Sequence, residues 1–418
     1  MAVTLNALSP TADINTIVQL ANQTKNLIQP EIFYSKQLLD TIRVDASQYK
    51  YYKLADEQPI QNNAEKLTVR RWAPLQAHTV PLEEGIPPKS DKGSVEKYEL
   101  SAKQYGRYME FTDLVDFNVV DPIIAHYTKE YSIVAIETLD MLAREELFSK
   151  AEQWFAGINS GASNPFEQLT IANSKPTLTD LRLIKLSLQR RLVKPRSDGY
   201  YHVIVSPEWS YDMVNDPTVE KFMTINQTTK NLYDGSVLFP MFGFTFEESL
   251  VVPTGGNFKK VDGSTIHDCM RIYRTNSDGT CEYATIDETT PLSTGSATKV
   301  RSVVSGYVKD SRTGQDASYI PDQVLWDIDH LTYNGKSDWK ELNVHHILIV
   351  GKDALTRTGM AGEGQAKMYA KPKGSAGVLD PIDQRQSIGF KINSVGFGST
   401  RLEAIVDYIC IPTTANLI

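Results

Sequence analysis

Residues 66 to 111 contain Leu67-Thr-Val-Arg-Arg-Trp-Ala-Pro-Leu75 on an outgoing arm and Ser94-Val-Glu-Lys-Tyr-Glu-Leu100, then Gln104-Tyr-Gly-Arg-Tyr-Met-Glu-Phe111, on a return arm. Apolar and polar residues alternate in both arms, which predicts an extended hairpin. Its tip includes the charged run Leu82-Glu-Glu-Gly-Ile-Pro-Pro88. Two strands alone are at best marginally stable in water. We therefore expect this hairpin, which has no core of its own, to lie on another subunit, with Gly106 as a hinge.

Length and composition fit a globular protein of two or three domains. The chain has 418 residues, of which 41% are apolar and 22% charged, so wholesale disorder is not expected. A net charge of −8 argues against a surface built to grip nucleic acid, which needs clustered Lys and Arg. No apolar run approaches the roughly 18 to 20 residues that span a bilayer, and the first residues lack a signal-peptide pattern. We expect a protein that stays in the cytosol, with no membrane contact.

The three cysteines are Cys269, Cys281 and Cys410. They cannot all pair, and no Cys-x-x-Cys spacing occurs. A predicted turn at Asn276-Ser-Asp-Gly279 places Cys281 opposite Arg274, too far from Cys269 for a disulfide in that register. Free thiols are the expectation.

Helical patterns occur in three parts of the chain. Residues 1–48 form a polar leader and short, loosely patterned helices, which we interpret as an arm. Asp121 is a good N-cap and Pro122 fits the first helical position, and no Gly or Pro interrupts the following residues to Phe148, so one long helix is predicted over 121–148. A second helix is predicted after the capping-box sequence Thr177-Leu-Thr-Asp180, with one apolar face made of Leu181, Ile184, Leu188 and Leu192.

Strand patterns dominate the second half. A buried strand is predicted at Tyr201 to Ser206, so the middle of the chain is α+β. Gly, Ser, Thr and Asp then increase between about 251 and 341, where short strands alternate with turns until a helical segment from Pro321 to His330. A central strand is predicted at Val344 to Gly351, a Gly-rich connection over 357–378, and a final strand from Arg401 to Ile411, which we expect to pair with Tyr105 to Phe111.

No catalytic constellation emerges from the residue types and spacings. His345 and His346 are adjacent, so on a strand they point to opposite faces; we expect one in the core and one exposed. Asp327 and Asp329 share a strand face and could contribute to a cation site, but the remaining ligands of a calcium loop are absent. Glu83 and Glu84, at a mobile tip, lack the fixed geometry of acid–base catalysis. We expect no enzyme, no cofactor and no metal.

Residue types that are common in protein interfaces occur together at Arg70, Arg71 and Trp72. Trp and Arg are over-represented at the energetic centres of protein interfaces. The alternative, an exposed strand face with a locally packed Trp, stays open. The tip carboxylates Glu83 and Glu84 could pair with basic residues of a neighbour.

Several runs together resemble the major capsid proteins of tailed bacteriophages, which have the Hong Kong 97 type fold, and more narrowly the coat-protein family of schitovirus-type podoviruses and related prophages. The similarity covers roughly residues 30–250 and 343–411, and its specificity lies in the shared order and spacing of the runs. They are Leu67 to Leu75, Leu82 to Gly85, Lys103 to Leu114, Asp121-Pro122, Thr179 to Arg182, Gly199 to Pro207, Tyr233 to Gly235, Phe242 to Phe244, Leu348 to Asp353 and Lys373 to Arg385.

The resemblance implies an α+β capsid fold with an arm, an extended loop, a peripheral domain and an axial domain. The segments are the N-terminal arm (1–48), a connection (49–65), the extended loop (66–111), the peripheral domain (112–198) with a spine helix (121–148), the first part of the axial domain (199–250), an added β-rich module (251–341), the axial completion (342–390) and a peripheral return strand (391–418). Implied loop contacts to a neighbour are Arg70, Arg71, Trp72, Glu83, Glu84, Tyr105 and Arg107, and the spine helix carries Asp121, Pro122, Tyr127 and Tyr131. The module from 251 to 341 departs from the family.

The function implied is that of a shell protein. Many copies would form hexamers and pentamers that close into an icosahedral virion capsid, assembled in the bacterial cytoplasm, enclosing double-stranded DNA without sequence-specific binding. Expected partners are other copies of the chain, a portal protein, a separate scaffolding protein and a possible decoration protein. Two alternatives stay open: a nanocompartment shell of the encapsulin kind, and a capsid protein whose β module binds a glycan or a decoration protein.

Overall fold

The computed structural model describes residues 45–60, 66–73, 75, 77, 79, 81, 85, 90–112, 123–157, 168–219, 221, 240–254, 258–262, 265–276, 278–287, 301–309, 316–326, 336, 338–360, 364–371 and 385–413. All of them belong to one compact unit, which comprises residues 44–118 and 122–418. Most of the expected arm, the tip residues Glu83 and Glu84, the helix-start residues Asp121 and Pro122, and the pair Asp327 and Asp329 lie outside these ranges.

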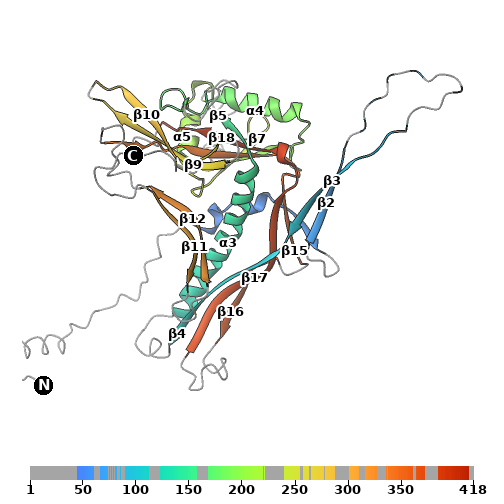
Figure 1. The fold of residues 1–418 in the computed structure, drawn as a ribbon, viewed down its shortest axis with the longest axis vertical. Helices are drawn as coiled ribbons and strands as arrows, with labels where there is room; N and C mark the ends of the chain where they lie inside the picture. The colour runs from blue at the N-terminus through green and yellow to red at the C-terminus, as the bar shows by residue number, and fades with distance from the viewer. Residues whose placement is uncertain are drawn as a thin grey trace, which may run out of the picture. The chain divides into compact units, whose positions relative to one another are not determined.

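A five-stranded mixed sheet forms the centre of the larger core (Figure 1). Its strands in spatial order are β5 (Glu152–Phe155), β18 (Ile405–Cys410), β14 (His345–Val350), β6 (Tyr201–Val205) and β7 (Phe244–Glu248). Every residue of β14 and β18 is buried. Near-continuous apolar runs of this kind are typical of strands covered on both faces. The strands predicted around 201–206 and 344–351 are confirmed.

Two short helices follow from clear capping signals. In α4 (Leu178–Arg190) the Thr177 hydroxyl oxygen accepts a hydrogen bond from the Asp180 amide at 3.2 Å, as its sequence predicts. Leu181, Ile184 and Leu188 are buried, but Leu192 is 79% exposed with φ 58°. The prediction was wrong for Leu192 because the helix ends before it. Ser206 caps α5 (Pro207–Val214), with Pro at its first turn.

The long helix α3 (Ile123–Lys150) packs against a second sheet (Figure 1). The sheet is organised around β17 (Arg385–Ser399), which is antiparallel to β4 (Lys103–Thr112), β16 (Lys367–Lys371) and β15 (Leu355–Met360); β15 also pairs in parallel with β1 (Asp56–Ile60). Alternate residues of β17 face the helix and form a core with it: Tyr131, Ala135, Leu139, Ile388, Phe390, Ile392 and Val395. The predicted uninterrupted helix is confirmed over its described part.

Two expectations about this sheet were wrong. The C-terminal strand β18 pairs with β14 and β5, not with residues 105–111, whose partner is β17. The reason is the apolar pattern: β18 is buried on both faces and suits a central position, whereas β4 is one-sided and matches the alternating β17. Residues 357–378 were expected to be a connection, but they contain most of β15 and all of β16.

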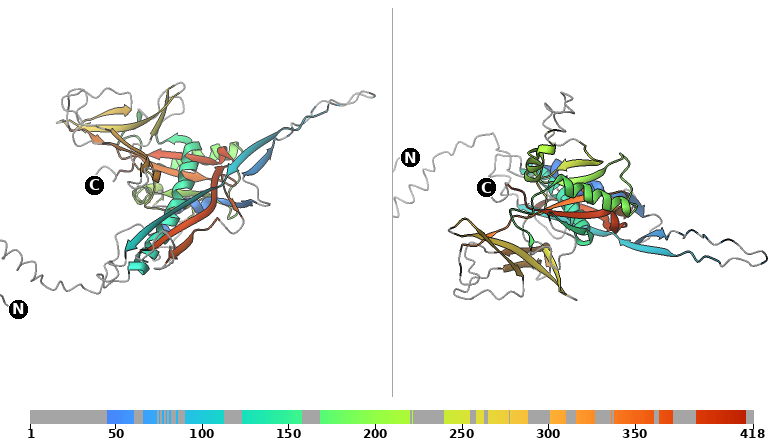
Figure 2. Two further views of the ribbon diagram at one scale, coloured as in Figure 1. Left: turned by 60° about the horizontal axis from the view of Figure 1, so that its bottom comes forward. Right: turned by 90° about the horizontal axis from the view of Figure 1, so that it is seen from above.

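The expected hairpin divides at its base. β2 (Lys66–Trp72) and β3 (Val95–Ser101) pair antiparallel with each other, while the later part of the return arm leaves as β4 and joins β17 (Figure 2). Gly106 is therefore not a free hinge. It lies opposite Lys391 inside the ladder, where a Cβ would come within 2.8 Å of the Phe390 carbonyl oxygen, so its bare backbone permits a close approach.

The region from 251 to 341 is β-structured where it is described. β9 (Thr265–Thr275) pairs with β8 (Phe258–Asp262), β10 (Cys281–Asp287) and β13 (Lys340–Glu341), and β11 (Arg301–Lys309) pairs with β12 (Asp316–Trp326). Because β12 reaches Trp326, the helix predicted from Pro321 is wrong there. Cys281 lies opposite Thr275, one residue from the expected register. Cys281 is free and exposed, and Cys410 is free and buried.

Three short 3-10 helices complete the described elements: η2 (Ala46–Gln48), η3 (Tyr51–Leu54) and η6 (Leu402–Ala404). Tyr51 and Leu54 of η3 are buried in the larger core, beside residues of α3 and the central sheet. The segment that leads into the hairpin is thus tied to the body of the chain.

Candidate functional site

The hairpin has one covered face and one open face. On the open face Trp72 lies opposite Val95 and Arg70 opposite Lys97. Trp72 is 72% exposed, which is unusual for a large aromatic side chain in a strand. An exposed Trp beside an Arg is a composition typical of the energetic centre of a protein interface.

The covered face is held by the same chain. Leu100 is buried and lies over Gly398 of β17, where a Cβ would overlap the Leu100 side chain. One guanidinium nitrogen of Arg71 donates to both carboxylate oxygens of Glu403, each at 3.1 Å. Burial acts to raise the pKa of Glu403, but hydrogen bonds from its backbone amide and from Arg71 outweigh it and lower that pKa. Arg71 therefore anchors the hairpin base, and only the Trp72 face lacks cover in the described chain.

A groove of 740 Å³ crosses the sheet on the face turned away from α3. Tyr108 of β4 and Tyr369 of β16 both lie opposite Gly389 of β17, roughly 10 Å apart across two strand spacings. They are 69% and 47% exposed. At Gly389 a Cβ would lie 2.5 Å from the Arg107 carbonyl oxygen, so the glycine provides the flat floor between the two rings.

The groove is basic although the chain is acidic. Lys371 and Lys391 lie on the same sheet face, in the rows on either side of the row that holds Gly389 and the two tyrosines. The charged residues on the groove's own face are Lys371, Arg385 and Lys391 against Glu110, and Arg385 lies 3.8 Å from Glu110. An acidic segment with apolar side chains would fit this surface.

The other predicted site residues lie between the sheet and the helix. Tyr105 packs partly buried in the core under α3, and Tyr127 of α3 packs against Phe111 at the other end of β4, with ring centroids 5.4 Å apart. Tyr131 is 6% exposed, with its ring centroid 6.1 Å from that of Phe390. Burial raises the pKa of Tyr131, and nearby Arg107 opposes that shift. The structure thus separates the candidates into a hairpin group (Arg70, Arg71, Trp72) and a group wholly or partly buried against α3 (Tyr105, Tyr127, Tyr131), while Arg107 is exposed.

The side chains that most resemble a catalytic set, those of Ser206, Glu208 and His345, have a structural role. The Nδ1 atom of His345 lies 2.8 Å from the Ser206 hydroxyl and 4.0 Å from a Glu208 carboxylate oxygen. In a catalytic triad the hydroxyl and the carboxylate bind different nitrogens of the imidazole, whereas here both are measured to Nδ1. Burial lowers the pKa of His345 to about 4, and the same hydroxyl caps α5 through the Trp209 amide. This arrangement fixes a helix start against the sheet.

Both histidines are in the core, so the expectation of one exposed imidazole was wrong. His346 is 5% exposed, and its Nδ1 lies 2.9 Å from a carboxylate oxygen of Asp407 on β18. The reason is that β14 is an interior strand, with α3 residues on one side and α5 on the other. In the part of the chain that the structure describes, no group of three or more His, Cys, Asp or Glu could hold a metal ion, and no helix there could cross a membrane.

Sequence reasoning missed the groove. Its signal is the alternation in Lys367-Met-Tyr-Ala-Lys371, which places Tyr369 and both lysines on one strand face. The neighbouring glycines favoured a loop interpretation instead. Tyr108 is not among the residues predicted in that arm, which are Tyr105 and Arg107 on the other face of the strand.

Comparison with solved structures identifies the fold. The chain is similar to the capsid of Cyanophage Pam1 (TM-score 0.56, 8% identity, 93% of this chain and 97% of that chain). It also resembles the capsid of Cyanophage P-SCSP1u (TM-score 0.52, 11% identity, 92% and 93%) and the mature capsid of bacteriophage PhiM1 (TM-score 0.50, 11% identity, 91% of each). No protein-family model and no curated protein matches. The fold is that of tailed-phage capsid proteins of the Hong Kong 97 type.

Proposed function

We propose that this chain is the major capsid protein of a tailed bacteriophage, a structural protein without catalytic activity. Many copies would associate as hexamers and pentamers into the icosahedral virion shell around the double-stranded DNA genome. The supporting observation is that the capsid fold accounts for more than nine tenths of this chain and of each matched chain.

The domain organisation we propose follows the two sheets. The peripheral domain comprises α3 with β4, β16 and β17, and the axial domain is built on the central sheet with α4 and α5. This division differs from the expected segments, which put α4 and β18 in the peripheral domain and β16 in the axial domain. Residues 251–341 are proposed as an added module. Membership of the schitovirus-type coat family, and partnership with a portal, a separate scaffold and a decoration protein, rest on the sequence resemblance alone.

The hairpin is proposed to contact a neighbouring subunit through its open face. Trp72 supplies the apolar area and Arg70 the hydrogen-bonding capacity, while Arg71 fixes the base to its own subunit through Glu403. We further propose that the acidic tip with Glu83 and Glu84 pairs with Lys371 and Lys391 in the groove of a neighbour. The charges of the two surfaces are opposite. The tip sequence also contains Pro87 and Pro88, which could pack on Tyr108 and Tyr369 of the groove.

Charge exchange tests the tip pairing. A tip variant, Glu83→Lys with Glu84→Lys, and a groove variant, Lys371→Glu with Lys391→Glu, should each reduce shell yield at least tenfold. A chain with all four substitutions should recover most of the yield, because it restores opposite charges. No recovery in that chain, with all three variants soluble and folded, would remove the proposed pairing while leaving the shell function in place.

Electron microscopy tests the function itself. The chain is expressed with its scaffold and imaged in negative stain. Closed, icosahedral particles are expected, since each modest interface is repeated around the shell. Material that remains monomeric under these conditions would contradict a capsid role.

A further inference from the structure

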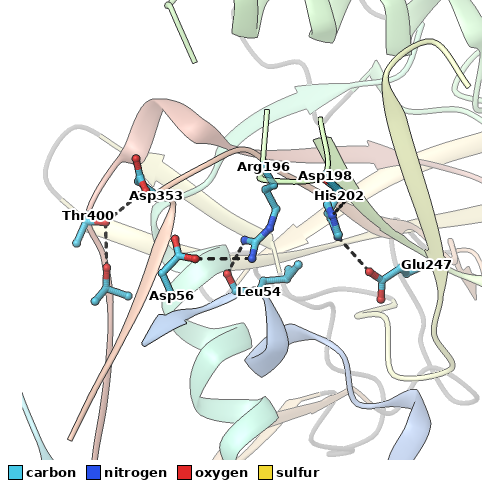
Figure 3. A network of polar contacts seen from close by, with 9 residues as sticks. Leu54, Asp56, Arg196, Asp198, His202, Glu247, Asp353 and Thr400 are labelled. Carbon is cyan, nitrogen blue, oxygen red and sulfur yellow. Dashed lines mark hydrogen bonds and ion pairs between the residues drawn. The ribbon is translucent and has the colours of Figure 1, made fainter. Parts of the chain in front are cut away.

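Residues 45–60, which we name the strap, precede the hairpin in the chain and are held by the pairing of β1 with β15, by buried apolar residues and by several polar contacts. The backbone amide of Tyr52 donates to the Asp140 Oδ1 atom of α3 at 3.0 Å. Arg196 donates to the Leu54 carbonyl oxygen at 2.7 Å and lies 3.8 Å from Asp56 (Figure 3). The Ser249 hydroxyl donates to the Gln48 carbonyl oxygen at 2.6 Å.

Of these contacts, only the one at Asp140 places a buried ionisable carboxylate on a strap amide. Asp140 is 1% exposed although it lies in the middle of a helix. Burial raises its pKa to about 6, and the amides of Tyr52 and Tyr51, together with Arg144 and Lys53, oppose that shift only in part. The other ionisable groups close by are the buried Tyr51 hydroxyl, whose pKa is raised, and Asp407, which acts on that hydroxyl.

We propose that Asp140 is a proton-controlled clasp for the strap, which tightens when the carboxyl group is protonated and weakens when it ionises. The strap itself covers the carboxylate, since η3 lies on α3 at this point. Opening the turn at Tyr51 to Leu54 lets water reach Asp140, and the group then returns to its ordinary acidity.

The direction of the effect follows from proton linkage. The docked strap raises the pKa of Asp140 from 3.8 to about 6, so the docked state binds the proton more tightly. Docking is therefore favoured in full below about pH 4, and this preference declines by about tenfold per pH unit until it is lost above about pH 6. A shift of this size changes the docking equilibrium by on the order of a hundredfold.

The clasp lies where the chain enters the hairpin, because the strap ends at Ile60 and β2 starts at Lys66. The strength of the clasp belongs to the single subunit, so it can be measured without assembly and does not depend on the proposed shell function.

Hydrogen exchange of the dispersed, full-length subunit tests the clasp. Protection of peptides covering 45–60 is measured between about pH 5 and pH 8 and corrected for the intrinsic exchange rate, with peptides from α4 as the internal reference. In the wild type we expect strap protection to fall by about tenfold between pH 5 and pH 7 and to stay level above that, while α4 stays constant. Strap protection that does not change with pH would overturn the proposal.

Two variants assign the effect to one group. Asp140→Asn keeps a carbonyl oxygen for the Tyr52 amide but cannot ionise, so strap protection should stay high at every pH. His202→Gln removes a histidine whose partner Glu247 interacts with Lys50 and Lys53 of the strap, and it should leave the wild-type strap profile intact. A flat profile in H202Q, or an unchanged one in D140N, would overturn the proposal. If D140N fails to fold, as judged by loss of α4 protection, the wild-type and H202Q profiles decide between the two groups.

Discussion

The two tryptophans Trp72 and Trp209 show at the residue scale how surroundings separate an interface side chain from a core one. Trp209 is completely buried and stacks on Phe246 with ring centroids 5.6 Å apart. Trp72 is mostly exposed on the open face of the hairpin. One residue type therefore occupies two different positions, and truncating each should have a different consequence.

Trp72→Ala should leave subunit stability within about 0.5 kcal/mol of the wild type, because the side chain has few neighbours to lose. Shell yield should fall at least tenfold, since aromatic anchors carry a large share of interface energy. Trp209→Ala is the matched control and should cost about 3 to 5 kcal/mol of folding stability. Thermal unfolding and particle counts measure the two effects; equal loss of both in W72A would identify Trp72 as ordinary core.

His202 makes a pH-dependent contribution to the central sheet. Its imidazole lies between Asp198, at 2.7 Å, and Glu247, at 3.1 Å (Figure 3). Hydrogen bonding to Glu247, then to Asp198, raises the His202 pKa against the effect of burial. The neutral ring can donate to only one of the two carboxylates.

Because the folded pKa is raised, the stability from His202 is fully present below about pH 6.5 and is lost as the pH rises through the folded value. His202→Gln should therefore destabilise the subunit by about 1 kcal/mol near pH 6. The difference from the wild type should shrink near pH 8.5. Melting temperatures of both proteins at the two pH values measure this, and a pH-independent difference would contradict the charged arrangement.

At the scale of elements, local signals were predictable and long-range pairings were not. The long helix and α4 follow from caps and apolar stripes within one segment, and β6 and β14 from compact apolar runs. The partner of β4 is β17, almost three hundred residues away in the chain. Neither segment contains a local signal for the other, so the sequence-based prediction paired β4 with the final strand, β18.

The candidate site shows the same division. Exposure of Trp72 agrees with an interpretation based on residue type alone. The role of Arg71 depended on Glu403, which is distant in the sequence and approaches only in the fold. The groove could not be predicted from one segment, because its floor and walls are made by residues of three adjacent strands, β4, β16 and β17.

The distal hairpin can be removed as a unit. Trp72 pairs with Val95, and the Ala73 amide donates to the Ser94 carbonyl oxygen at 3.0 Å. Deleting residues 76–92 leaves a five-residue connection with Gly93, long enough to close the hairpin. The shortened subunit should stay folded and soluble but fail to close shells. Normal particles from this deletion would show that the distal loop is dispensable for assembly.

At the scale of the whole molecule, the subunit combines an anchored hairpin with a groove, and both suit contact with neighbouring subunits of the proposed shell. The base of the hairpin is fixed by Leu100 and Arg71, its open face presents Trp72, and the basic groove lies on the sheet beside α3. In a closed shell both surfaces can be buried by identical neighbours. A single subunit leaves both exposed.

Three-dimensional reconstruction of particles formed by this chain, at a resolution that separates strands, tests this most directly. We predict an icosahedral shell of hexamers and pentamers in which the Trp72 face of each hairpin is covered by an adjacent subunit. Particles in which that face remains in solvent, or preparations without closed shells when the scaffold is supplied, would contradict the account.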